Sequence, residues 1–144
     1  GGLSFSYDAS KTAQVLNSSF AATTAGERIR SLKVGNDVVV NNGVIVGNGS
    51  RTFRLVTLSF LAERGDGYPF PAALLNKTDL TTLTSANLGG LASTATATLG
   101  SEQDALMKYL KSQFSTNAYN TADTIEALDL RIQNLAARTD TVLK

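Results

Sequence analysis

Short β-branched runs separated by Asn-Gly and Gly-Asn turns dominate residues 27–49. In order, the pieces are E-R-I-R-S-L-K-V, G-N, D-V-V-V, N-N-G, V-I-V and G-N-G. Valine and isoleucine favour strands, while Asn-Gly pairs supply the positive φ angles that tight hairpin turns need. This region therefore predicts short antiparallel hairpins, and it limits the fold to one that contains an antiparallel sheet.

Two further stretches have strand-like patterns. Residues 1–8 alternate Leu3, Phe5 and Tyr7 with serines, which is typical of a half-buried strand. Residues 52–61 carry apolar side chains at both odd and even positions. That pattern predicts a central strand, covered on both faces, that ends at Phe60.

Helical signals occur near the C-terminal end. Ser101 and Asp104 form a capping pattern before an apolar stripe, which predicts a helix with the stripe in the core. The stripe consists of Ala105, Leu106, Tyr109, Leu110 and Phe114. Residues 124–137 favour a second piece, either helical or extended. The expected fold is α+β, with a mostly antiparallel sheet followed by C-terminal helices.

The amino-acid content narrows the function. The 144 residues include no histidine and no cysteine, and the 12 acidic residues are scattered. Ser-His and Cys-His nucleophiles therefore cannot be built from this chain, and no residue here is assigned to catalysis or to a metal ion. A net charge of +1 gives no reason to expect a nucleic-acid partner. No apolar run approaches the roughly 18–20 residues that would predict a membrane span.

The stretch S-F-L-A-E-R-G-D-G-Y, residues 59–68, resembles the C-terminal substrate domain of the 5'-nucleotidase and UDP-sugar hydrolase family. That family has a strand ending in N-F-L-A-x-G-G-D-G-Y/F. Upstream, G-G-L-S-F-S-Y-D, R-I-R-S-L-K-V and S-R-T-F-R-L-V-T-L are similar to other strands of the family in the same order. E-Q-D-A-L-M-K-Y-L-K, residues 102–111, resembles the helix that follows.

The resemblance implies a substrate site. Phe60 would stack on a nucleobase, and Asp66 would accept hydrogen bonds from the ribose hydroxyls. Gly65 and Gly67 would let the backbone approach the ligand, and Tyr68 would lie beside it. Each residue also has a plainer interpretation: Phe60 as a core aromatic, Asp66 as an Asx-turn residue and Tyr68 as a packing residue.

The chain departs from the family pattern at two positions. Arg64 stands where the first glycine of the pair is usual, and Ser59 stands where asparagine is common. Since the first of these positions lies in the turn itself, Arg64 is expected to alter the geometry of the ribose contact.

The resemblance also implies what lies outside this chain. The two divalent metal ions, the catalytic His-Asp pair and the second stacking aromatic belong to upstream parts of the family's proteins. We therefore expect an incomplete substrate domain, joined to an upstream metallophosphoesterase domain and inactive by itself. Its expected location is periplasmic, cell-surface or secreted.

Within the expected substrate domain, residues 1–78 form the β-rich part, 79–100 an Ala/Thr/Gly-rich loop and 101–144 the helical part. An incomplete domain would leave sheet edges uncovered, which predicts self-association or strand exchange. The alternative function is a non-catalytic structural or interaction module of a larger secreted protein.

Overall fold

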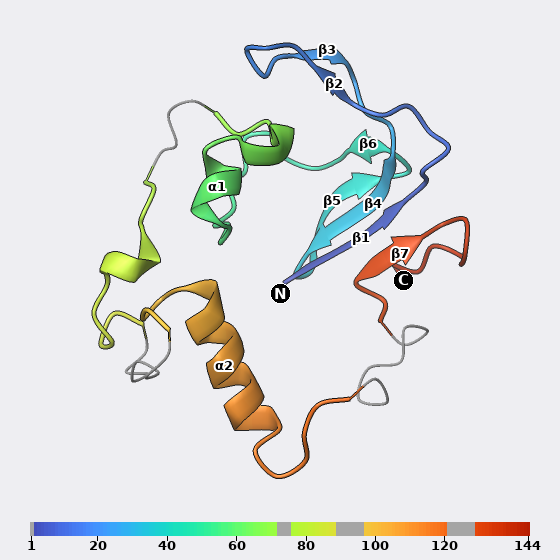
Figure 1. Cartoon of the computed structure of the whole chain (residues 1–144). Helices are drawn as coiled ribbons and strands as arrows, with labels where there is room; N and C mark the ends of the chain where they lie inside the picture. Colours follow the sequence, from blue (N-terminus) through green and yellow to red (C-terminus); the bar gives the residue numbers. More distant parts are fainter. Residues whose placement is uncertain (1, 72–75, 89–96, 121–128) are drawn as a thin grey trace. The chain divides into compact units, whose positions relative to one another are not determined.

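The computed structural model describes residues 2–71, 76–88, 97–120 and 129–144. The chain divides into two compact units. One consists of Gly1–Val56 with Thr124–Lys144, and the other of Thr57–Asp123. Figure 1 traces the elements of both units along the chain.

The first unit is built on a five-stranded sheet with the order β6-β5-β4-β1-β7. The strands are β1 (Leu3–Tyr7), β4 (Ile29–Val34), β5 (Asp37–Asn41), β6 (Val44–Ile45) and β7 (Ile132–Asn134). All neighbours are antiparallel except β1 and β7, which run parallel. A second, two-stranded antiparallel sheet pairs β2 (Val15–Leu16) with β3 (Ala22–Thr24). The predicted mostly antiparallel α+β architecture is confirmed.

Both hairpin turns lie where the sequence predicts them. Val34 pairs with Asp37 across Gly35 and its neighbour, and Gly35 has a φ of 57°. In the second turn, Asn42 and Gly43 have φ angles of 45° and 79°. Two successive positive φ angles characterise a type I′ turn, whose twist matches that of the flanking strands. The turn residues therefore set the register of β4, β5 and β6.

The register separates polar from apolar side chains on the main sheet. Ser6 of β1 lies opposite Ser31 of β4 and Gln133 of β7, and all three are buried. One residue earlier, Phe5 lies opposite Ile132, and these side chains point to the other face. Ile132 is 58% exposed, so the polar face is the better covered one.

The C-terminal segment covers this polar face through Asp140. The hydroxyls of Ser6 and Ser31 each donate to Asp140 Oδ2 at 2.6 Å. The backbone N–H of Val142 donates to Asp140 Oδ1 at 3.0 Å. Burial raises the pKa of Asp140, but the hydrogen bonds from Ser31, Ser6 and Val142 outweigh burial and hold the pKa below the usual 3.8. Asp140 thus satisfies two buried hydroxyls from different strands.

The second unit contains the described helices. They are α1 (Ser59–Ala62), the 3-10 turns η1 (Gly65–Gly67) and η2 (Leu80–Thr82), and α2 (Glu102–Gln113). Ser101 caps α2 as predicted, since its hydroxyl accepts a hydrogen bond from the Asp104 N–H at 3.2 Å. Asp104 is buried, and its carboxylate pairs with Lys108 one turn later at 2.6 Å. These contacts fix where α2 begins.

The predicted strand over residues 52–61 is wrong. Residues 51–58 form no regular element, and Phe60 lies inside α1. A central strand needs two partners, but the positions beside β1 are taken by β4 and β7. Local hydrophobicity alone did not reveal that a segment near the C-terminal end of the chain fills this place.

The expected C-terminal helices are corrected in part. The structure describes one of them, α2, and residues 132–134 form strand β7, the extended alternative for the piece predicted over residues 124–137. Residues 124–128 lie outside the described residues, as do 72–75 of the expected β-rich part and 89–96 of the expected loop. The stripe on α2 is not a core either, because Leu106 and Tyr109 are exposed.

Candidate functional site

The motif at residues 59–68 folds as a chain of consecutive turns. After α1, the N–H of Arg64 donates to Leu61 O at 3.0 Å. The N–H of Gly67 then donates to Arg64 O, and that of Tyr68 to Gly65 O, both at 3.2 Å. Each bond closes a turn of four residues. The motif is therefore an ordered, compact piece of backbone rather than an extended strand end.

Three residues of the motif have left-handed backbone conformations. The φ angles are 73° for Arg64, 55° for Asp66 and 74° for Gly67. Glycine adopts this region without steric cost and aspartate tolerates it, whereas an arginine there is strained. Arg64 Nε donates to Phe70 O at 2.8 Å, which ties the strained residue to the far side of the turn. The departure from the family pattern thus falls on a position that favours glycine.

Phe60 lies against the backbone of Gly65. A Cβ atom placed on Gly65 would come within 2.5 Å of two ring atoms of Phe60, which is closer than real contacts allow. The ring is nevertheless 59% exposed, so the core interpretation of Phe60 is wrong. Gly65 is needed for this contact, because any side chain would push the ring away. The result is a supported aromatic ring with much of its surface open to solvent.

Asp66 presents a free carboxylate. Among the described residues, it is the one aspartate or glutamate whose side chain makes no hydrogen bond or ion pair. Neighbouring Glu63 is paired with Lys77 at 2.9 Å. An Asx turn would require the Asp66 side chain to accept a backbone N–H, as Asp79 does from Thr81. The Asx-turn interpretation is therefore wrong for Asp66.

Gly67 and Tyr68 complete the motif. A Cβ atom on Gly67 would meet nothing within 4 Å, so space beside this residue is open. The ring of Tyr68 stacks on Phe70 with 6.3 Å between ring centroids and an interplanar angle of 13°. Tyr68 remains exposed despite this contact. The motif thus places an exposed ring, a free carboxylate and a second exposed ring along one short stretch of chain.

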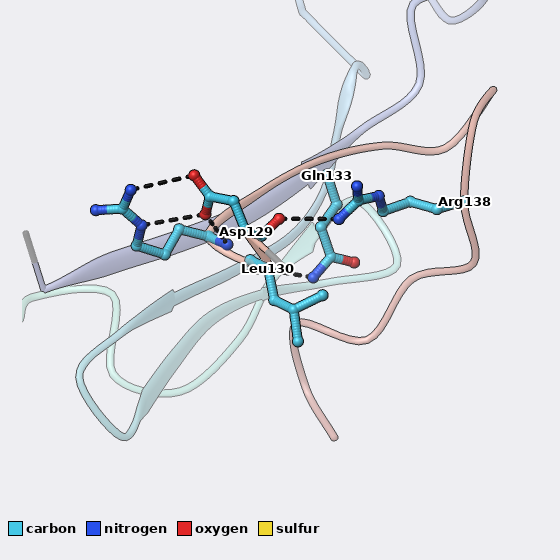
Figure 2. Close-up of polar contacts among 5 residues, drawn as sticks. Asp129, Leu130, Gln133 and Arg138 are labelled. Atoms are coloured by element: carbon cyan, nitrogen blue, oxygen red, sulfur yellow. Dashed lines mark hydrogen bonds and ion pairs between the residues drawn. The ribbon is translucent and has the colours of Figure 1, made fainter. Parts of the chain in front are cut away.

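A second polar cluster lies just before β7, in the other unit (Figure 2). Arg131 forms two bonds to the carboxylate of Asp129, both at 3.1 Å. Arg138 donates to the Asp129 backbone oxygen at 2.8 Å, and Gln133 donates to Leu130 O at 2.7 Å. Hydrogen bonds from Arg131 hold the pKa of Asp129 below its ordinary value. The charged side chains of Asp129, Arg131 and Arg138 therefore hold the backbone of the segment that leads into β7.

The metal ions implied by the resemblance find no donor set in the described residues. No three aspartate or glutamate side chains there lie close enough together to hold an ion. Likewise, none of the helices in the described ranges is long and apolar enough to cross a membrane.

Comparisons with known proteins give no relative. No family model, no curated protein and no solved structure matches the chain.

Proposed function

We propose that this chain binds the base and ribose of a nucleotide and belongs to a 5'-nucleotidase-like metallophosphoesterase that hydrolyses nucleotide phosphate esters. The observation that carries the proposal is the pairing of an exposed aromatic ring with a free carboxylate in one ordered turn. Phe60 rests on Gly65, and Asp66 has no partner among the described residues.

The chemistry of both side chains suits a nucleoside. An aromatic face stacks on any base, which contributes about 1–3 kcal/mol per base. An ionised carboxylate only accepts hydrogen bonds, so it pairs with the two hydroxyls of a ribose. Gly67 leaves room for the sugar to approach the backbone, and the exposed Tyr68 ring extends the apolar surface.

In the proposed intact protein, an upstream metallophosphoesterase domain supplies two divalent ions that activate water at phosphorus. The residues described here would orient the substrate for that step. The chain alone would therefore bind nucleosides weakly and hydrolyse nothing. The same proposal implies that the protein is periplasmic, on the cell surface or secreted.

One observation favours the alternative of a structural or interaction module. The apolar side chains of α2, including Leu106 and Tyr109, are exposed. Exposed apolar stripes on a helix often bind another protein. A module of this kind would need neither a free carboxylate nor a supported aromatic ring.

A titration of the chain with AMP and with adenosine, followed by the NMR shifts of the aromatic rings, tests the proposal. We expect the Phe60 ring to shift, and F60A to remove binding while F60Y keeps it. D66N should weaken the binding of adenosine more than the binding of a dideoxynucleoside, which lacks both ribose hydroxyls. F53A is the matched control, because Phe53 is also an exposed aromatic but lies outside the motif. Equal losses in F60A and F53A, or no shift at saturating AMP, would contradict nucleotide binding.

A further inference from the structure

The chain contains two Asn-Gly pairs, Asn42-Gly43 and Asn48-Gly49. In such a pair, the glycine nitrogen can attack the side-chain carbonyl carbon of the asparagine and close a five-membered imide. Glycine presents no Cβ to obstruct ring closure. The two pairs share this chemistry, so any difference between them must come from the fold.

The first pair is held in the type I′ turn between β5 and β6. The N–H of Gly43 donates to Arg30 O at 2.8 Å, which occupies the nitrogen that would have to attack. Arg30 also donates to the side-chain oxygen of Asn42 at 2.6 Å, and its guanidinium lies over Gly43. Ring closure at Asn42 would require these bonds to break.

The second pair is open. Asn48 and Gly49 are exposed, and in the described part of the chain the Gly49 N–H has no acceptor. The N–H of Ser50 donates to Asn48 Oδ1 at 2.9 Å, which places the carboxamide alongside the following backbone and polarises its carbonyl. A Cβ atom on Gly49 would meet nothing within 4 Å, so the surroundings do not hinder the ring.

We propose that Asn48 is a site of spontaneous deamidation and that the fold protects Asn42. The Gly49 nitrogen loses its proton and forms a bond to Cγ of Asn48, while the Cγ–Nδ2 bond breaks. Nδ2 takes up the proton and leaves as ammonia. Water then opens the imide at either carbonyl, adding its hydroxyl to carbon and its proton to nitrogen. The product is aspartate or isoaspartate at position 48, with no change in oxidation state.

The modification has a structural consequence at the edge of the main sheet. Arg51 N donates to Asn48 O at 3.2 Å, and its side chain donates to Val46 O at 2.6 Å. Isoaspartate lengthens the backbone by one carbon between residues 48 and 49 and adds a negative charge. Arg51 would then be displaced from the carbonyl oxygens that it holds beside β6.

Ageing of the folded chain in mildly alkaline buffer prepared in ¹⁸O-water, followed by peptide mass mapping, tests the proposal. We expect solvent oxygen to enter the peptide containing Asn48 roughly tenfold faster than the peptide containing Asn42, the factor that one occupied hydrogen bond supports. N48Q should remove labelling at position 48, and G49A should slow it, because the added Cβ hinders ring closure. G49A keeps the fold because the added methyl group meets open space.

The same experiment in concentrated urea is the control for conformation. Once the chain is unfolded, the two asparagines should deamidate at similar rates. Faster or equal labelling at Asn42 in the folded chain would overturn the proposal. A difference that persists in urea would also overturn it, because the protection would then not come from the fold.

Discussion

Arg64 has a φ of 73° in the turn that carries the candidate site. For a residue with a Cβ, the left-handed region costs about 1–2 kcal/mol. The bond from Arg64 Nε to Phe70 O at 2.8 Å offsets part of this cost. The side chain thus stabilises a conformation that its own backbone disfavours.

Substitutions at Arg64 separate these two effects. R64A loses the bond but keeps the strain, whereas R64G loses the bond and relieves the strain. We expect the free energy of unfolding of R64G to lie within about 0.5 kcal/mol of that of the natural chain. R64A should be about 1 kcal/mol less stable than R64G. Urea denaturation measures both values. Equal stability of the two variants would mean that the turn stores no strain.

Gly65 offers a sharper test of how Phe60 is supported. A methyl group at this position meets the Phe60 ring at 2.5 Å, so G65A must displace the ring. We expect a change in the Phe60 ring shifts, with a loss of only about 0.5 kcal/mol in the free energy of unfolding, because the exposed ring can move aside. G49A, where the space is open, is the matched glycine control. Unchanged Phe60 shifts in G65A would show that the ring does not rest on this glycine.

The sequence singled out residues of a candidate site whose role in binding stays a prediction, and it did not predict their geometry. The motif at residues 59–68 singled out Phe60, Asp66 and Tyr68, and the structure places them within a few residues of one another on consecutive turns. The absence of an Asx bond at Asp66 and the contact of Phe60 with Gly65 depend on side-chain packing. Residue types alone do not specify either contact.

At the scale of elements, the sequence predicted the features that nearby residues determine, but it did not predict which distant strands pair. The Asn42-Gly43 turn and the Ser101 cap act within four residues, so the sequence around them is sufficient. Strand β7 pairs with β1 from the far end of the chain, and residues 52–61 were expected to fill a central position instead. Hydrophobic pattern indicates that a segment could be a strand, but not which segment finds a partner.

Asp140 connects β1, β4 and the C-terminal segment, and its loss should destabilise the sheet. D140A leaves the buried hydroxyls of Ser6 and Ser31 without their acceptor, which should cost about 2 kcal/mol. D140N keeps one acceptor oxygen and should cost less. D8A, at an aspartate whose carboxylate accepts hydrogen bonds from Ser10 in its own turn, should cost less than D140A. A D140A variant as stable as D8A would contradict this role.

The pH dependence of stability follows from the same contacts. The folded-state pKa of Asp140 lies below the ordinary value of 3.8, so its stabilising contribution is fully present above that value. The contribution is lost as pH falls through the folded pKa, because the protonated carboxyl is uncharged and accepts the hydrogen bonds of Ser6 and Ser31 less well. Melting temperatures between neutral pH and pH 3 should therefore fall more steeply for the natural chain than for D140N. Parallel pH profiles would contradict the assignment.

At the scale of the whole molecule, apolar burial is sparse. Among the described residues, Val142 is the one buried hydrophobic side chain, while many large apolar side chains remain exposed. The edge strand β6 is an example, since Ile45 is 72% exposed and no charged residue occurs between Val38 and Ser50. Edge strands usually carry charge or proline that opposes pairing with another chain. Strand β6 itself carries neither, and the Arg51 side chain that bonds to Val46 O lies just beyond its end, so Val44 and Ile45 favour contact with a second copy.

We expect the chain to self-associate at rising concentration, with β6 as the pairing edge. I45K introduces a charge at this edge and should restore a monomer in light scattering. L55K is the matched control, because Leu55 is 64% exposed but lies in no strand. If both variants reduce association equally, the cause is general apolar attraction and not strand pairing. A natural chain that stays monodisperse and melts in one sharp transition would show instead that its exposed apolar surface is tolerated without a partner.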